Sequence, residues 1–292
     1  MTQTPDLSPI RARGETPVHP AQIDVDEVDR LGDDLVAALD AADALATRDA
    51  VQQALNDFDD FDDLDVELVV FDMAGTTVRD DGLVERAFVL AAQRSGIAPT
   101  EAALEEALDY VRETMGQSKI DVFRELTDTE SEALAANEAF ELAYGELIAR
   151  VGVTSIDGAE DLFQELRDAG VKIALTTGFS RTTQDALIDS LGWANLIDLS
   201  LSPAEAGRGR PHPDLPLTAL LRTGASGVAA MVVVGDTASD MLSGTSAGAG
   251  LVVGVRTGTH DTETLEAAGA DVVIDSVAHL AELLGLRAES IG

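Results

Sequence analysis

Three short apolar runs, each followed at once by a polar residue, constrain the fold of this chain more than any other feature. The runs cover residues 67–71, 171–175 and 229–234, and they end in Asp72, Thr176-Thr177-Gly178 and Gly235-Asp236. Short apolar runs separated by helical patterns are typical of buried parallel strands. Two weaker runs, 251–255 and 272–274, continue the alternation. The sequence therefore predicts an α/β fold with a Rossmann-like, doubly wound parallel sheet.

The segment between the first two runs, residues 73–170, contains no convincing strand. Apolar residues recur there at helical spacing over residues 83–95, 101–114, 120–126 and 131–151. We interpret residues 83–152 as an inserted helical cap domain. The core is then expected in residues 63–82 and 153–292, with hinges near Gly82 and Gly152, the glycines beside the two joins.

The N-terminal part has a different character. Residues 1–22 contain four prolines and little apolar content, which predicts a disordered arm. Residues 23–62 combine helical apolar spacing with the acidic stretch DFDDFDDLD, which predicts an acidic helical extension. Two functions are open for this extension, namely docking of a partner or simple solubilisation, and we favour the second.

The charge balance excludes several kinds of partner. Asp and Glu total 54 against 19 Lys and Arg, so the formal net charge is −35. Such a surface disfavours nucleic acid and anionic membranes as partners. Only Lys119 and Lys172 are lysines, and an acidic, lysine-poor surface predicts a halophilic, cytoplasmic protein that works in concentrated salt. The absence of cysteine excludes disulfides, thiolate metal sites and a cysteine nucleophile.

Polar side chains at matching strand ends predict a site. Asp72, Thr177 and Asp236 each follow an apolar run, and ligands of open parallel sheets bind beyond the carboxyl ends of the strands. Asp240 lies one helical turn after Asp236 and can support the same site. Several carboxylates with few nearby cations favour a hard divalent ion such as Mg²⁺. Each aspartate alone is better explained as a turn or helix N-cap residue, so the prediction depends on the set.

Four ordered segments resemble the motifs of the haloacid dehalogenase superfamily. These are Phe71-Asp72-Met73-Ala74-Gly75-Thr76-Thr77, Thr176-Thr177-Gly178, Gly207-Arg208-Gly209-Arg210-Pro211 and Gly235-Asp236-Thr237-Ala238-Ser239-Asp240. The resemblance implies that Asp72 is the nucleophile and that Asp236, Asp72 and the backbone carbonyl of Ala74 bind Mg²⁺. It also implies that Thr177 holds a phosphoryl oxygen and that Arg210 pairs with the nucleophile and the phosphoryl group.

Ala74 points to one branch of this superfamily. Phosphatases of the superfamily usually carry an aspartate at that position, as general acid for the leaving group. The alanine version resembles the phosphonatase-like branch, which hydrolyses 2-oxo-phosphonates such as phosphonoacetaldehyde. Met115-Gly116-Gln117-Ser118-Lys119-Ile120-Asp121 is similar to the cap segment that carries the lysine of this branch. By resemblance, Lys119 forms a Schiff base, and Met115 and Gly178 line the substrate site.

The chain departs from the branch at two positions near these motifs. Val122 stands where the branch has a histidine, and Phe179 stands where it has a tyrosine. We therefore regard the type of reaction as better supported than the exact substrate. A solvated lysine near a helix start is the alternative interpretation of Lys119.

Other functions remain open at this stage. The main alternative is a small-molecule phosphomonoesterase of the same superfamily, similar to the phosphoglycolate phosphatases. A dehalogenase is less well supported, because the fourth motif is of the metal-binding type. A binding or regulatory protein on this fold is a further alternative. For both the phosphonatase and the phosphomonoesterase the expected partner is a small phosphonate or phosphate, and the resemblance implies a possible homodimer.

Overall fold

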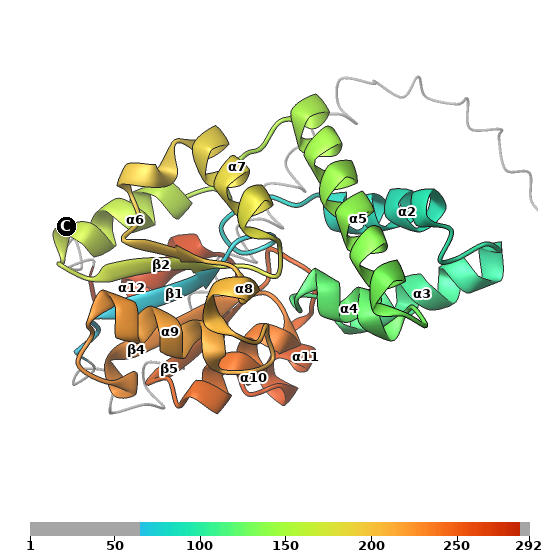
Figure 1. Cartoon of the computed structure of the whole chain (residues 1–292). Coiled ribbons are helices and arrows are strands. Elements are labelled where there is room, and N and C mark those ends of the chain that lie inside the picture. Colours follow the sequence, from blue (N-terminus) through green and yellow to red (C-terminus); the bar gives the residue numbers. More distant parts are fainter. Residues whose placement is uncertain (1–64, 287–292) are drawn as a thin grey trace, which may run out of the picture. The chain divides into compact units, whose positions relative to one another are not determined.

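A computed structural model describes residues 65–286 (Figure 1). The predicted disordered arm, 1–22, and the acidic helical extension, 23–62, lie outside the described residues. In the described part, no helix is long and apolar enough to cross a membrane.

The centre of the fold is a six-stranded sheet in which every neighbouring pair of strands is parallel. The strand order is β3-β2-β1-β4-β5-β6. The strands are β1 (Leu68–Asp72), β2 (Lys172–Thr176), β3 (Leu199–Leu201), β4 (Met231–Gly235), β5 (Leu251–Val255) and β6 (Val272–Ile274). The predicted doubly wound parallel sheet is confirmed, and the order reverses beside β1, where ligands of such sheets bind.

Strand β3 is the one strand of the sheet that the sequence did not predict. It has three residues and lies at the sheet edge, where Leu199 and Ser200 are half-buried. So short and partly exposed a strand lacks the apolar run that identifies the central strands.

Alternate residues of the central strands pack on opposite faces of the sheet. Val69 and Phe71 of β1 join one apolar cluster with α6 and α7, and Leu68 and Val70 join another with α9. In Figure 1, α6 and α7 lie on one side of the sheet and α9 and α10 on the other. The core helices are α6 (Ala159–Asp168), α7 (Arg181–Leu191), α8 (Pro203–Ala206), α9 (Asp214–Thr223), α10 (Ala238–Ala247), α11 (Thr262–Ala267) and α12 (Leu280–Leu283). Three 3-10 turns cover Trp193–Asn195, Val228–Ala230 and Val277–His279.

Four helices between β1 and α6 form the cap. They are α2 (Leu83–Ser95), α3 (Glu101–Glu113), α4 (Lys119–Glu125) and α5 (Glu130–Val151). Phe88 and Phe123 stack at 5.3 Å, and Phe123 meets Phe140 of α5 edge-on at 6.1 Å. Gly82 (φ 72°) and Gly152 (φ 92°) flank the cap in conformations that favour glycine. Motion about these two glycines stays a prediction.

Phe179 joins the cap to the core. It follows β2, yet its ring lies 4.6 Å from Tyr144 and 6.2 Å from Phe140, both on α5. The loop after β2 therefore packs into the aromatic cluster of the cap.

Candidate active site

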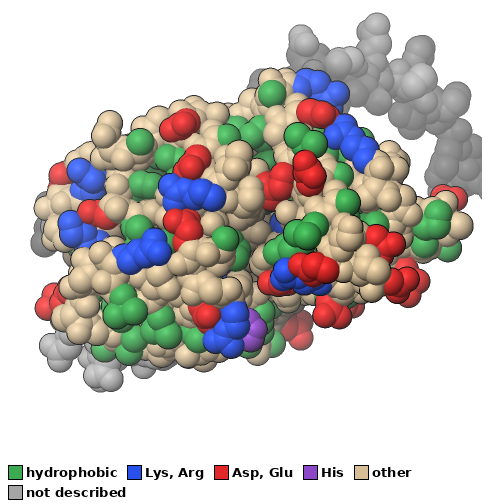
Figure 2. Space-filling view, viewed as in Figure 1, with side chains coloured by type: hydrophobic (Ala, Val, Ile, Leu, Met, Phe, Trp, Pro, Cys, Tyr) green, Lys and Arg blue, Asp and Glu red, His purple; other side chains and the backbone are tan. Residues whose placement is uncertain are grey.

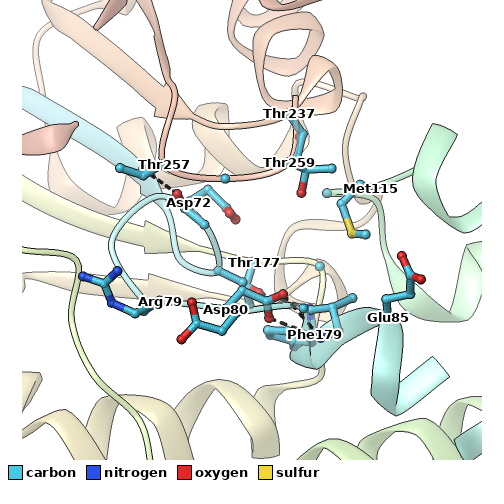
Figure 3. Close-up of a pocket in the computed structure, with 18 of the residues that line it drawn as sticks. Asp72, Arg79, Asp80, Glu85, Met115, Thr177, Phe179, Thr237, Thr257 and Thr259 are labelled. Carbon is cyan, nitrogen blue, oxygen red and sulfur yellow. Dashed lines mark hydrogen bonds between the residues drawn. The ribbon is translucent and has the colours of Figure 1, made fainter. Parts of the chain in front are cut away.

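A pocket of about 350 Å³ lies between the carboxyl ends of the strands and the cap. The loops after β1, β2, β4 and β5 form one part of its lining, and residues of α2 and of the α3–α4 segment form the rest. Figure 3 shows Thr237, Thr257 and Thr259 on one side of this pocket and Asp80, Phe179 and Glu85 on the other. Of the predicted residues, the pocket contains Asp72, Ala74, Met115, Lys119, Thr177 and Gly178.

Asp72 and Arg210 form a buried ion pair. Asp72 ends β1, and its Oδ1 lies 2.6 Å from a guanidinium nitrogen of Arg210. The same nitrogen lies 2.7 Å from Oδ1 of Asp240. The neighbouring Arg208 is exposed and pairs with Asp214 at 2.8 Å. The structure thus places Arg210, the arginine implied by the resemblance, beside the nucleophile, and Arg208 at the surface.

Three buried aspartates converge beside this pair. One carboxylate oxygen from each of Asp72, Asp236 and Asp240 lies within 4.8 Å of the others. Burial and the nearby charge of Asp72 raise the pKa of Asp236 well above its ordinary value. Burial also raises the pKa of Asp240 to about 7, although Arg210 opposes the shift. Arg210 is the one cation among the described residues that pairs with any of these three buried carboxylates. The excess of negative charge suits a hard divalent cation such as Mg²⁺, which prefers oxygen ligands.

Close backbone approach holds Asp236 in place. Its Oδ1 accepts a hydrogen bond from Thr76 Oγ1 at 2.8 Å, and its Oδ2 accepts one from the backbone N–H of Thr259 at 2.8 Å. A Cβ atom added to Gly75 would lie 2.5 Å from Asp236 Oδ2, and one added to Gly258 would also overlap this carboxylate. Residues with side chains at either glycine would displace the carboxylate from the cluster.

Three glycines let the segment before α4 approach the core. Gly116 faces Thr237, Gly178 faces the backbone oxygen of Gln117, and a Cβ on Gly209 would lie 2.6 Å from that of Ser118. The backbone N–H of Lys119 donates to the carbonyl of Gly178 at 3.0 Å. Gly178 therefore serves the contact between cap and core as well as lining the pocket.

Lys119 begins α4 and faces the pocket from the cap. It is only 8% exposed, so the alternative of a solvated lysine is wrong, although the helix start is confirmed. Lys172 pairs with Asp198 at 3.0 Å, whereas Lys119 forms no salt bridge with any described residue. Its Nζ lies 5.8 Å from the ring centroid of Phe179. Burial lowers the pKa of Lys119, although the charges of Asp72 and Asp80 oppose the shift.

The remaining predicted positions agree with a phosphoryl site. Thr177 is buried, and its Oγ1 accepts a hydrogen bond from the backbone N–H of Phe179 at 3.2 Å. Ala74 brings no acid to the pocket, and Met115 lies on its cap side.

The sequence interpretation missed the residues of α2 and α3 that line the pocket, and it missed two parts of the loops. One is the segment Thr257–Thr259, which could have been found because it follows the predicted strand 251–255. The other is Asp80, on the loop before α2, whose carboxylate accepts a hydrogen bond from the backbone N–H of Val84 at 3.2 Å. An aspartate near a helix start is too common in sequences to be recognised as part of a site.

Comparisons with known proteins agree with this geometry. Residues 66–248 match the family model described as haloacid dehalogenase-like hydrolase. A phosphonoacetaldehyde hydrolase of Bacillus cereus is 31% identical over 202 residues, which cover 63% of this chain and 73% of the relative. The chain therefore belongs to the haloacid dehalogenase-like hydrolases, and its relatives are of the phosphonatase type, as the motifs predicted.

Solved structures confirm the fold. A hydrolase from Pseudomonas syringae has a TM-score of 0.66 and 24% identity, over 76% of this chain and all of that one (100%). A phosphonoacetaldehyde hydrolase-like protein from Oleispira antarctica has a TM-score of 0.65 and 24% identity, over 76% of this chain and 92% of that one.

Proposed function

We propose that this enzyme is a Mg²⁺-dependent hydrolase that cleaves the carbon–phosphorus bond of a 2-oxo-phosphonate such as phosphonoacetaldehyde. The observation that carries the proposal is the position of Lys119, a buried lysine without a salt bridge among the described residues, in the same pocket as Asp72. The sequence similarity to phosphonoacetaldehyde hydrolase supports the same substrate class.

Lys119 supplies what this bond cleavage needs. Direct cleavage of a carbon–phosphorus bond would expel a carbanion, which is a poor leaving group. Condensation of the Lys119 amine with the substrate carbonyl gives an iminium ion, and the group that leaves phosphorus is then an enamine. An enamine needs no acid at position 74, in keeping with Ala74. The amine must be neutral to attack, and burial lowers its pKa in that direction.

Asp72 receives the phosphoryl group. Its carboxylate attacks phosphorus in line and forms an aspartyl phosphate, which water then hydrolyses. Arg210, 2.6 Å from Asp72, reduces the repulsion between two anions, and Thr177, which lines the pocket, binds a phosphoryl oxygen. Asp72, Asp236 and the carbonyl of Ala74, supported by Asp240, would hold Mg²⁺. The ion would neutralise negative charge on the transferring group.

Borohydride trapping tests the proposal. The protein is incubated with Mg²⁺ and phosphonoacetaldehyde in high salt, reduced with borohydride, and mapped by mass spectrometry. We expect a reduced adduct on Lys119, phosphate release before reduction, and neither in Lys119→Met. Lys172→Met is the matched control, because it removes the other lysine of the chain and should retain both signals. Absence of an adduct together with Mg²⁺-dependent hydrolysis of phosphate esters would overturn the proposal in favour of a phosphomonoesterase.

We also propose that the enzyme works in a salt-rich cytoplasm. The formal charge of −35 supports this, and Figure 2 shows acidic side chains spread over the face of the cap helices. Dissolved salt screens repulsion between such charges over a few ångströms at molar concentration. Activity and the melting temperature should both rise between about 0.1 M and several molar KCl. Full activity and stability at the lower concentration would contradict this proposal.

A further inference from the structure

Asp80 is a pocket carboxylate that the proposed reaction has not yet used. We propose that Asp80 transfers protons to and from the nitrogen of Lys119 and the substrate oxygen while the imine forms and breaks. The inference rests on the proposed function, because it assigns a residue to the Schiff-base step.

The other carboxylates of the pocket are either paired with an arginine or exposed. Asp72 is paired with Arg210, and Glu85 accepts hydrogen bonds from Arg112 at 2.7 and 3.0 Å. Asp81 is exposed. Asp80 is half-buried and forms no salt bridge with the described part of the chain. It is therefore the carboxylate that is free to exchange a proton beside Lys119.

The loop before α2 fixes the position of Asp80. Its two carboxylate oxygens lie 3.2 and 3.4 Å from the backbone nitrogen of Val84, in the first turn of α2. These contacts hold the side chain in place and leave the carboxylate able to bind a proton, because a carboxylate can accept several hydrogen bonds. Val122 lies one helical turn after Lys119, and the ring centroid of Phe179 lies 5.8 Å from the Nζ of Lys119. Both side chains are hydrocarbons, so neither can carry a proton.

Burial is consistent with a proton-transfer role. It raises the pKa of Asp80, which brings the carboxyl closer to the pH range in which both protonation states are populated. The titratable groups that face Asp80 are Lys119 from α4, Tyr144 from α5 and Asp81 on its own loop. Burial raises the pKa of the Tyr144 phenol, so this group stays protonated and cannot be the base.

The neutral Lys119 amine attacks the carbonyl carbon, a carbon–nitrogen bond forms, and the carbonyl π electrons move to oxygen. Asp80 takes one proton from the positively charged nitrogen and returns it to this oxygen. A second proton comes from solvent in the pocket, water leaves, and the nitrogen lone pair forms the protonated imine. The same transfers in reverse release the aldehyde product after the enamine carbon has been protonated.

The test is the rate at which the Lys119 adduct appears. Protein and phosphonoacetaldehyde are mixed with Mg²⁺, quenched with borohydride after increasing times, and the adduct is quantified by mass spectrometry over a range of pH. We compare wild type, Asp80→Asn, and Asp80→Ala with and without formate. Asp261→Asn is the matched control, because Asp261 is an exposed N-cap residue outside the pocket. Thermal melts verify that every variant is folded.

We expect Asp80→Asn and Asp80→Ala to slow adduct formation about 100-fold or more, in the range of general acid–base effects. Formate should restore part of the rate to Asp80→Ala, and the ionisation of Asp80 should disappear from the pH profile of Asp80→Asn. Asp261→Asn should behave as wild type. Adduct formation near the wild-type rate in both Asp80 variants would overturn the inference and leave the proposed function intact. A slow folded variant with neither formate rescue nor a changed pH profile would also overturn it. Absence of an adduct in wild type would overturn both proposals.

Discussion

On the core side, Asp72 lines the pocket and lies beside Arg210, Asp236 and Asp240, and we call this group of four the core wall. In this group every charged side chain has a partner of opposite charge or a hydrogen-bond donor. On the cap side, we call Met115, Lys119 and the contact of Lys119 with the ring of Phe179 the cap wall. Its one charged group, Lys119, forms no salt bridge with the described residues, whereas Glu85 and Arg112, which also line the pocket, pair with each other.

The difference between the walls matches the two halves of the proposed chemistry. Phosphoryl transfer handles highly charged oxygens, and preorganised charges stabilise them without reorganisation. Imine formation needs an uncharged amine, and burial without an anionic partner favours that state. We therefore expect that removal of a charge from the core wall lowers turnover or stability. Removal of the charge of the cap wall should leave the stability of the fold unchanged.

The largest expected effect is on turnover, when the nucleophile of the core wall is removed. In Asp72→Asn, phosphate release from phosphonoacetaldehyde should fall by at least about 10⁴-fold, as for other nucleophile deletions. The Lys119 adduct should still be trapped by borohydride, because the cap wall is unchanged. Loss of the adduct as well would show that the two walls do not act separately.

The next effect is on stability. Arg210→Met should lower the free energy of unfolding by about 3–5 kcal/mol, because it leaves buried carboxylates without their cation. Urea unfolding with EDTA present measures this, since a bound divalent ion would offset the loss. Arg208→Met is the matched control, and loss of its exposed pair with Asp214 should cost at most about 1 kcal/mol. Equal losses in the two variants would contradict the description of the core wall.

A smaller effect is expected where the walls meet. In Gly178→Ala the new Cβ would overlap the backbone oxygen of Gln117, so the segment before α4 must move away from the core. We expect kcat/KM to fall by about 10- to 100-fold, because a misplacement of about 1 Å can cost this much. Gly145→Ala is the control on α5, where an added Cβ meets nothing within 4 Å. Its helix should gain about 1 kcal/mol at most, and unchanged activity in Gly178→Ala would contradict a tight cap contact.

The smallest effect should follow from removing the charge of the cap wall. Lys119→Met should not reduce stability at neutral pH, because the charged form of Lys119 is disfavoured by burial. The folded pKa lies below 10.5, so the folded state binds fewer protons than the unfolded state between these two values. Wild-type stability relative to Lys119→Met should therefore rise with pH through this window and be lowest below the folded pKa. Urea unfolding at several pH values measures the trend, and a slope of the opposite sign would contradict it.

The parts of this molecule that follow strict periodicity could be predicted from the sequence. Asp72 and Asp236 end strongly apolar runs, and the topology of a parallel sheet brings such ends together. Helix α2 was also predicted with the bounds that the structure has, because its apolar face is continuous.

Other features depend on contacts that no local pattern records. The resemblance implied Arg210, but its burial is set by the fold of one loop, which turns Arg210 inward and Arg208 outward. The burial of Lys119 depends on Phe179, which lies 60 residues further along the chain. The position of Asp80 in the pocket depends on how the cap is joined to the core.

The ring contacts of Phe179 have a thermal consequence. Phe179 lies on the active-site loop, whereas Tyr144 and Phe140 lie on α5, so any movement of α5 away from the sheet hydrates aromatic surface. The free energy of such hydration is largely entropic near room temperature, and it decreases as water is cooled. The contact between cap and core is therefore weakest at low temperature. Opening of the cap has a positive heat-capacity change, as unfolding has.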